Sequence, residues 1–117
     1  MKLFNSRTNK PKTLEEKVMQ NGFFYIEDIV FYAAEKKIKI VFINNPEAQS
    51  AKRVLYFLEV EDLSEEILSE DFEKGDIDSL IGLDEYYENN YVKYVVHTEV
   101  RELIFRTKQN PIIEDVG

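Results

Sequence analysis

The apolar positions in the middle of the chain are typical of β-strands. Residues 39–43 (KIVFI) form a short apolar run, which the turn-forming residues 44–46 (NNP) end. Residues 53–60 (RVLYFLEV) place apolar side chains at every second position, the period of a strand with one buried face. Because only a polar loop separates the two runs, we expect 39–43 and 53–60 to pair as a short antiparallel sheet.

The apolar positions in the last third of the chain follow the period of a helix. Between residues 91 and 108 most apolar side chains fall on one helical stripe and charged side chains fall opposite. A strand of this length without a turn signal would be unusual. The pattern therefore predicts a C-terminal helix, about 91–108, with the apolar stripe Val92, Val95, Val96, Val100, Leu103 and Ile104.

Local signals predict further helices. Thr13 and Glu16 form a capping box, in which each side chain satisfies a free backbone amide of the other, so a helix is expected over 14–21. Ser64 is followed by acidic residues that suit the positive end of a helix dipole, which predicts a second, acidic helix. The short apolar segment 80–83 predicts one more helical turn packed onto the core.

Residues 23–37 fit two structures. The run from Ala33 to Lys37 contains good helix formers, and it favours a helix over about 25–37. The preceding residues are rich in aromatic and β-branched side chains, which favour strands. The alternative is therefore a strand over 23–34, which would extend the sheet to a three-stranded meander.

These elements predict an α+β fold. A chain of 117 residues with 44% hydrophobic residues can bury one core, so we expect a single domain over 13–110. The polar and basic residues 1–12 read as a flexible arm, and residues 111–117 read as a tail. No signal-peptide pattern or membrane-spanning run is visible, so a cytoplasmic protein without membrane contact is expected.

Motifs for chemistry are missing from the sequence. The chain has no cysteine, which excludes disulfides and thiolate zinc sites, and its four glycines do not cluster into a phosphate-binding loop. His97 is the only histidine and lacks metal-ligand spacing. A calcium loop centred on Gly75 would place Phe72 and Lys74 at ligand positions. We therefore expect no enzyme, cofactor or metal site, and an irregular divalent site within 71–78 is the least favoured alternative.

The charge of the chain is strongly segregated. Of its 23 carboxylates, thirteen lie between Glu59 and Glu88, where Lys74 is the single base, and the formal net charge of the whole chain is −8. Such a block repels nucleic acid and anionic membranes and attracts basic surfaces. The sequence thus predicts a basic protein partner and no direct contact with nucleic acid.

Tyrosines accompany the last part of this acidic block. Tyr86, Tyr87, Tyr91 and Tyr94 lie beside the acids of 84–88. Tyrosine is enriched at binding hot spots, and neighbouring carboxylates can pair with lysine and arginine on a partner. The predicted binding residues are Glu61, Asp62, Glu65, Glu66, Glu70, Asp71, Asp84, Glu85, Tyr86, Tyr87, Glu88 and Tyr91.

The first functional hypothesis is a small acidic inhibitor that neutralises a basic partner, one that acts on nucleic acid. Toxin-immunity proteins and phage-encoded inhibitors that mimic nucleic acid work in this way, and the likeness here is one of size, charge and tyrosine content. The alternative is a structural or regulatory accessory subunit that self-associates or docks through the C-terminal helix.

Overall fold

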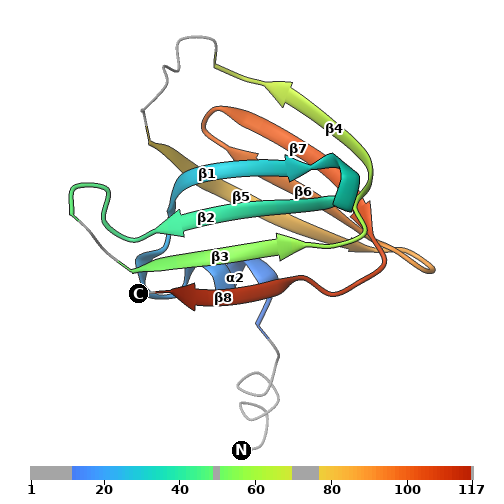
Figure 1. The fold of residues 1–117 in the computed structure, drawn as a ribbon, viewed down its shortest axis with the longest axis horizontal. Coiled ribbons are helices and arrows are strands. Elements are labelled where there is room, and N and C mark those ends of the chain that lie inside the picture. Colours follow the sequence, from blue (N-terminus) through green and yellow to red (C-terminus); the bar gives the residue numbers. More distant parts are fainter. Residues whose placement is uncertain (1–11, 49–50, 70–76, 117) are drawn as a thin grey trace, which may run out of the picture.

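The chain folds as an antiparallel β structure with one short α-helix (Figure 1). The computed structural model describes residues 12–48, 51–69 and 77–116. The helix is α2, Leu14–Met19, and it continues into the 3₁₀ turn η1, Gln20–Gly22. The strands are β1 Tyr25–Tyr32, β2 Lys37–Ile43, β3 Lys52–Phe57, β4 Glu61–Ile67, β5 Asp78–Tyr87, β6 Val92–Thr98, β7 Arg101–Thr107 and β8 Ile112–Val116.

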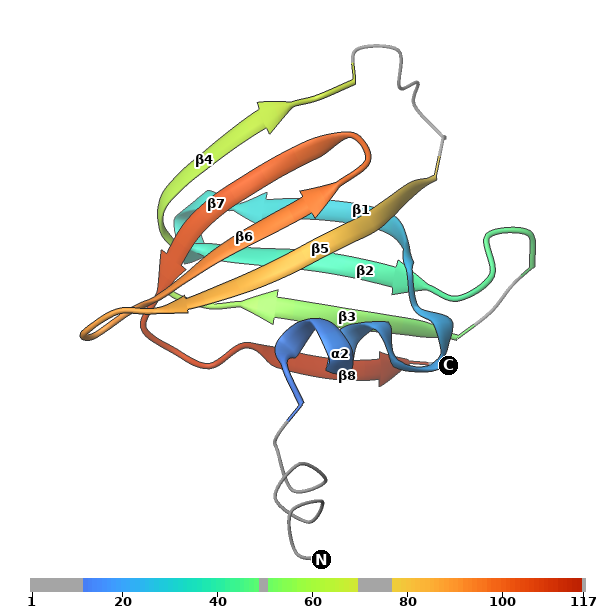
Figure 2. The same ribbon diagram turned by 180° about the vertical axis from the view of Figure 1, so that it is seen from behind.

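The strands form two halves that face each other. The order across the sheet is β4-β7-β6-β5-β1-β2-β3-β8. We call β1, β2, β3 and β8 the first half, and β4, β5, β6 and β7 the second half. The halves are joined where β1 pairs with β5, and this pairing covers only Tyr25 with Ser79 and Ile26 with Asp78. The second half therefore separates from the first and crosses it, as Figures 1 and 2 show from opposite sides.

The core lies between the two halves. Phe57 of β3 packs against Tyr94 of β6 and Phe105 of β7, with ring centroids 4.8 Å and 4.7 Å apart. Inward side chains from both halves are almost completely buried, as the alternation of side chains along strands requires. Leu14 and Val18 of α2 join the same core, so the helix covers the corner that the second half leaves open.

The predicted C-terminal helix is wrong, because 91–108 forms the β6–β7 hairpin. β-Branched valines at this spacing suit a strand as well as a helix. The turn lacks glycine and proline, and the buried Thr98 hydroxyl takes their place. It accepts from the amides of Val100 (3.1 Å) and Arg101 (3.0 Å) and donates to the carbonyl oxygen of Arg101 (3.2 Å).

The other predicted internal helices are also strands, so the α+β assignment is replaced by a mostly β fold. The acidic segment after Ser64 lies in β4, the edge strand that pairs with β7, and the apolar residues at 80–83 lie in β5. Residues 25–32 form β1, and the alternative of a strand in a β1-β2-β3 meander is what the structure contains. Ala33–Glu35 form only the 3₁₀ turn η2 before β2 begins.

The two ends of the domain differ in how well local signals describe them. The Thr13–Glu16 capping box is present, and it starts α2 as predicted. The segment expected to be a tail contains β8, which pairs with β3 through Ile112 to Val116 and completes the first half. The predicted flexible arm lies outside the described residues except for Lys12.

A buried arginine holds α2 against the first half. Arg53 of β3 donates from Nη1 to the carbonyl oxygens of Lys17 (3.1 Å), Val18 (2.9 Å) and Gln20 (2.7 Å), which would otherwise lack partners at the helix end. Its Nε and Nη2 form a two-bond pair with Asp115 of β8 at 2.6 Å and 3.0 Å. One side chain therefore links the helix to two strands.

None of the helices in the described ranges is both long enough and apolar enough to cross a lipid bilayer.

Candidate binding site

Acidic side chains from distant parts of the sequence share the outer face of the second half. Residues that are paired on neighbouring antiparallel strands lie on the same face of a sheet. From the β5–β6 turn the rows across the sheet are Tyr86–Lys93–Arg106–Glu61, then Asp84–Val95–Ile104–Ser64, then His97–Glu102–Glu66. We call this surface, together with Asp62 and Glu88, the acidic face. It combines carboxylates of β4 with those of β5, although two strands lie between them.

Arg106 of β7 neutralises part of this charge. Arg106 lies 3.6 Å from Asp62 and 3.2 Å from Glu88, so it bridges the β4 side and the β5 side of the acidic face. On the opposite side of the sheet Arg101 pairs with Glu65 at 3.0 Å. Such exposed pairs contribute little stability. Among the described residues of the acidic face, Glu61, Glu66 and Asp84 form no ion pair.

The β5–β6 hairpin carries the exposed tyrosines. Its turn is closed by the amide of Glu88 donating to the carbonyl oxygen of Tyr91 (2.9 Å) and by the reverse bond (3.4 Å). Tyr86 is 52% exposed and Tyr87 is 78% exposed, and the hairpin tip projects beyond the body of the protein (Figure 2). Tyr91 is partly buried, and the cations of Arg106 and Lys108 lie over its ring.

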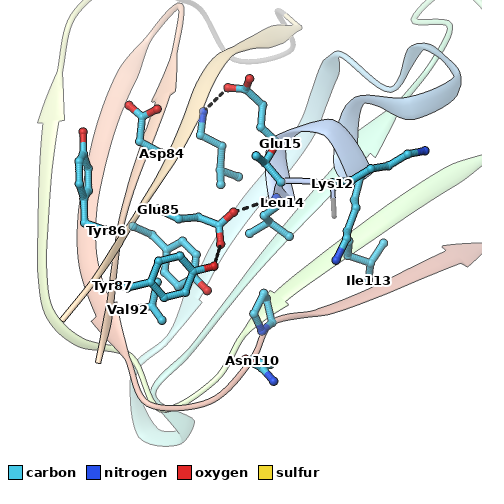
Figure 3. A pocket seen from close by; sticks show the side chains of 15 residues that line it. Lys12, Leu14, Glu15, Asp84, Glu85, Tyr86, Tyr87, Val92, Asn110 and Ile113 are labelled. Carbon is cyan, nitrogen blue, oxygen red and sulfur yellow. Dashed lines mark hydrogen bonds between the residues drawn. The ribbon is translucent and has the colours of Figure 1, made fainter. Parts of the chain in front are cut away.

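Successive side chains of β5 point to opposite sides. Asp84 and Tyr86 belong to the acidic face, whereas Glu85 and Tyr87 turn toward α2 (Figure 3). The Glu85 carboxylate accepts from the amide of Leu14 (2.8 Å) and from the hydroxyl of Tyr87 (2.8 Å). It therefore stabilises the start of the helix, where backbone amides lack partners. The hydrogen bond to Glu85, and the negative charge of that carboxylate, raise the pKa of Tyr87.

A side chain of α2 also accepts a hydrogen bond from the backbone of β5. Glu15 accepts from the amide of Leu83 at 2.7 Å, so α2 and β5 each cap a backbone group of the other (Figure 3). Sequence reasoning could not find this exchange, since Glu15 and Leu83 are far apart in the chain. The capping box predicted the helix but gave no indication of the strand it contacts.

A cavity of about 750 Å³ lies between the hairpin, the start of α2 and β8. Its apolar wall includes Leu14, Val92, Tyr94 and Ile113, and Lys12, Lys17 and Asn110 line its polar side. Burial of Tyr94 and the nearby Glu85 carboxylate raise the pKa of that tyrosine to about 12. Sequence reasoning missed the cavity because it is built from both ends of the domain and from β5.

The structure places about half of the predicted binding residues on one face and the others elsewhere. Glu61, Asp62, Glu66, Asp84, Tyr86 and Glu88 lie together on the acidic face. Glu85 and Tyr87 face the cavity, Glu65 lies on the other side of β4, and Tyr91 is half-buried below two cations. Glu70 and Asp71 lie outside the described residues.

Among the described residues no group of three or more histidine and acidic side chains is arranged to hold a metal ion. His97 has one carboxylate nearby, Glu102 at 3.8 Å. Of the acids considered for an irregular divalent site within 71–78, only Asp78 is described.

Comparison with protein-family models, with curated proteins and with solved structures found no match to this chain.

Proposed function

We propose that this protein is an acidic binding protein that occupies a basic surface of a protein partner. The observation that carries the proposal is the acidic face, which holds carboxylates of β4 and β5 and the exposed ring of Tyr86 on one side of the second half. Part of the acidic segment of the sequence, namely Glu61, Asp62, Glu66, Asp84 and Glu88, thus lies on one face of the protein.

The charge of this surface suggests the kind of partner. Proteins that act on nucleic acid carry clustered lysine and arginine, because they neutralise phosphates. A carboxylate surface can occupy such a groove and thereby keep nucleic acid out of it. Charge complementarity speeds association, and a rigid tyrosine ring adds buried contact area. We therefore infer that binding blocks the partner's access to nucleic acid.

The accessory-subunit alternative has lost its basis. It assumed an apolar stripe on a C-terminal helix, but those residues form β6, β7 and their turn. Val96, Val100 and Leu103 are buried in the domain, whereas Val92, Val95 and Ile104 are partly buried, so the predicted stripe does not form one exposed apolar surface.

The test compares two charge reversals of equal size. The partner is captured from source-cell extract at low salt, purified, and its affinity is measured at several salt concentrations. Asp84→Lys lies on the acidic face, and Glu114→Lys lies on the outer face of the first half, so it is the matched control. We expect Asp84→Lys to weaken binding by about tenfold or more, equivalent to at least about 1.4 kcal/mol, and Glu114→Lys to have little effect. Equal effects of the two variants, or affinity that does not fall with salt, would refute the proposal.

A further inference from the structure

One edge of β5 is left without a strand neighbour. β1 pairs with β5 only at Ser79 and Asp78, and the amide of Leu80 still donates to the carbonyl oxygen of Phe24 at 2.8 Å. A register shift then follows between Leu80 and Gly82, and β1 leaves. The remainder of β5 is paired with β6 on one side only, although the strand continues to Tyr87.

The backbone groups on this free edge can be identified. Glu88 and Tyr91 exchange both hydrogen bonds of their pair, so by the alternation of antiparallel ladders the pairs 87–92, 85–94 and 83–96 do not. The Leu83 amide follows this alternation, because it points away from β6 and donates to the Glu15 carboxylate. Glu85 and Tyr87 thus direct their backbone amides and carbonyls to the free edge, where no described residue bonds to them.

The edge at Glu85 and Tyr87 differs from the outer edge that β4 forms. β4 is protected by carboxylates and by an irregular register near Asp62, a residue with a positive φ of 55°. The β5 edge has no comparable irregularity after Gly82, and it borders the cavity. A segment added here would gain main-chain hydrogen bonds and also a place for its side chains.

The cavity and the acidic face select different side chains of such a segment. Alternate side chains of an added strand would point into the cavity, where Leu14, Val92 and Ile113 favour apolar residues. The carboxylates of Glu15 and Glu85 in its lining already accept hydrogen bonds from backbone amides, and Lys12 and Lys17 balance their charge. The intervening side chains would lie beside Asp84 and Tyr86, where basic residues are favoured. On that face Lys93 lies over the ring of Tyr86 at 6.0 Å, and Arg106 is held by Asp62 and Glu88.

We propose that the free edge of β5 binds an extended segment of the basic partner, in which apolar and basic residues alternate. The segment pairs with Glu85 and Tyr87, places its apolar residues in the cavity, and places lysine or arginine beside Asp84. This inference rests on the proposed function and names the element of the partner that is recognised.

The test follows amide exchange by NMR with a blocked eight-residue peptide that alternates lysine and valine. A peptide of the same composition with all lysines before all valines is the control. In the free protein we expect fast exchange at Glu85 and Tyr87 and slow exchange at Asp84 and Tyr86, whose amides face β6. The alternating peptide should slow exchange at Glu85 and Tyr87 by about tenfold or more, and the control peptide should do so much less.

A second variant checks the role of the cavity. Ile113→Trp fills the cavity without changing charge. We expect this variant to bind the alternating peptide more weakly and to keep the Asp84 and Tyr86 amides protected. Unchanged exchange at Glu85 and Tyr87 with millimolar alternating peptide would overturn the inference, as would protection of these amides in the free protein. The proposed function would survive that result if the captured partner still distinguished Asp84→Lys from Glu114→Lys.

Discussion

Replacing Arg53 should be far more damaging than replacing its acidic partner. The Arg53 side chain is only 6% exposed, whereas the Asp115 side chain is 63% exposed. Arg53→Met keeps much of the apolar stem but removes the donor for three carbonyl oxygens at the end of α2. Asp115→Asn leaves those three bonds in place, and it also leaves the guanidinium over the ring of Phe23 at 4.2 Å.

The loss of stability in each variant depends on how far water can replace the lost hydrogen bonds. A hydrogen bond from a charged donor contributes about 1.5–3 kcal/mol, and a buried carbonyl without a partner carries a comparable penalty. The bond to Val18 is buried, while those to Lys17 and Gln20 are partly buried, so water recovers part of the loss there. We therefore expect Arg53→Met to lower the free energy of unfolding by about 3–5 kcal/mol. For Asp115→Asn the expected loss is below about 1 kcal/mol, because that carboxylate is well solvated.

Urea unfolding at neutral pH, followed by far-ultraviolet circular dichroism, measures both losses. A stability of about 5–15 kcal/mol is usual for a domain, so Arg53→Met should shift the midpoint strongly or leave the chain unfolded. Nearly equal losses for the two variants would refute the reasoning, as would a loss below about 1 kcal/mol for Arg53→Met. Because Arg53 lowers the pKa of Asp115, the contribution of Asp115 is present above the ordinary aspartate pKa and is lost as pH falls through the lowered value. The unaltered protein should therefore lose more stability in acid than Asp115→Asn.

Three further substitutions test other parts of the structure. Tyr94 has a raised pKa, so its contribution is present below pH 10 and is lost as pH rises toward about 12; Tyr94→Phe should flatten stability over that range in alkaline unfolding curves. Glu85→Gln should lower the pKa of Tyr87 toward its ordinary value in a spectrophotometric titration, and an unchanged titration curve would contradict the assigned contact. Thr98→Val should lower the thermal midpoint and reduce the free energy of unfolding by about 1–3 kcal/mol, because it leaves the turn amides of β6–β7 without their acceptor. An unchanged thermal midpoint would mean that water replaces the Thr98 hydroxyl.

The sequence predicted the parts of the fold that depend on neighbouring residues. The cap at Thr13 needs only the side chain three positions later, and it was correct. The strands expected at 39–43 and 53–60 overlap β2 and β3 for the same reason, since turn formers and alternating side chains mark them locally. The 91–108 segment failed because its valines fit both periods and because Thr98, rather than glycine, makes the turn.

The candidate site was predictable as a composition but not as a surface. The clustering of acids and tyrosines near residues 84–88 was visible in the chain. The separation of Asp84 from Glu85 was not, because it depends on the register of β5 with β6 and on the irregularity before Gly82. The bond from the Leu14 amide to Glu85 spans a sequence separation of 71 residues, which no local pattern can reveal.

The order of the strands has a consequence for how the chain reaches this structure. The first half takes its edge strand β8 from beyond β7, and the second half takes its edge strand β4 from directly after β3. The second half, β4 to β7, is therefore a continuous stretch of chain between β3 and β8, whereas the first half is interrupted by it and cannot be cut out as a fragment with all its strands. Pairing strands that are far apart in the chain costs loop-closure entropy before their contacts form, and folds of this kind form in milliseconds to seconds. We expect both halves to be gained and lost in a single cooperative transition.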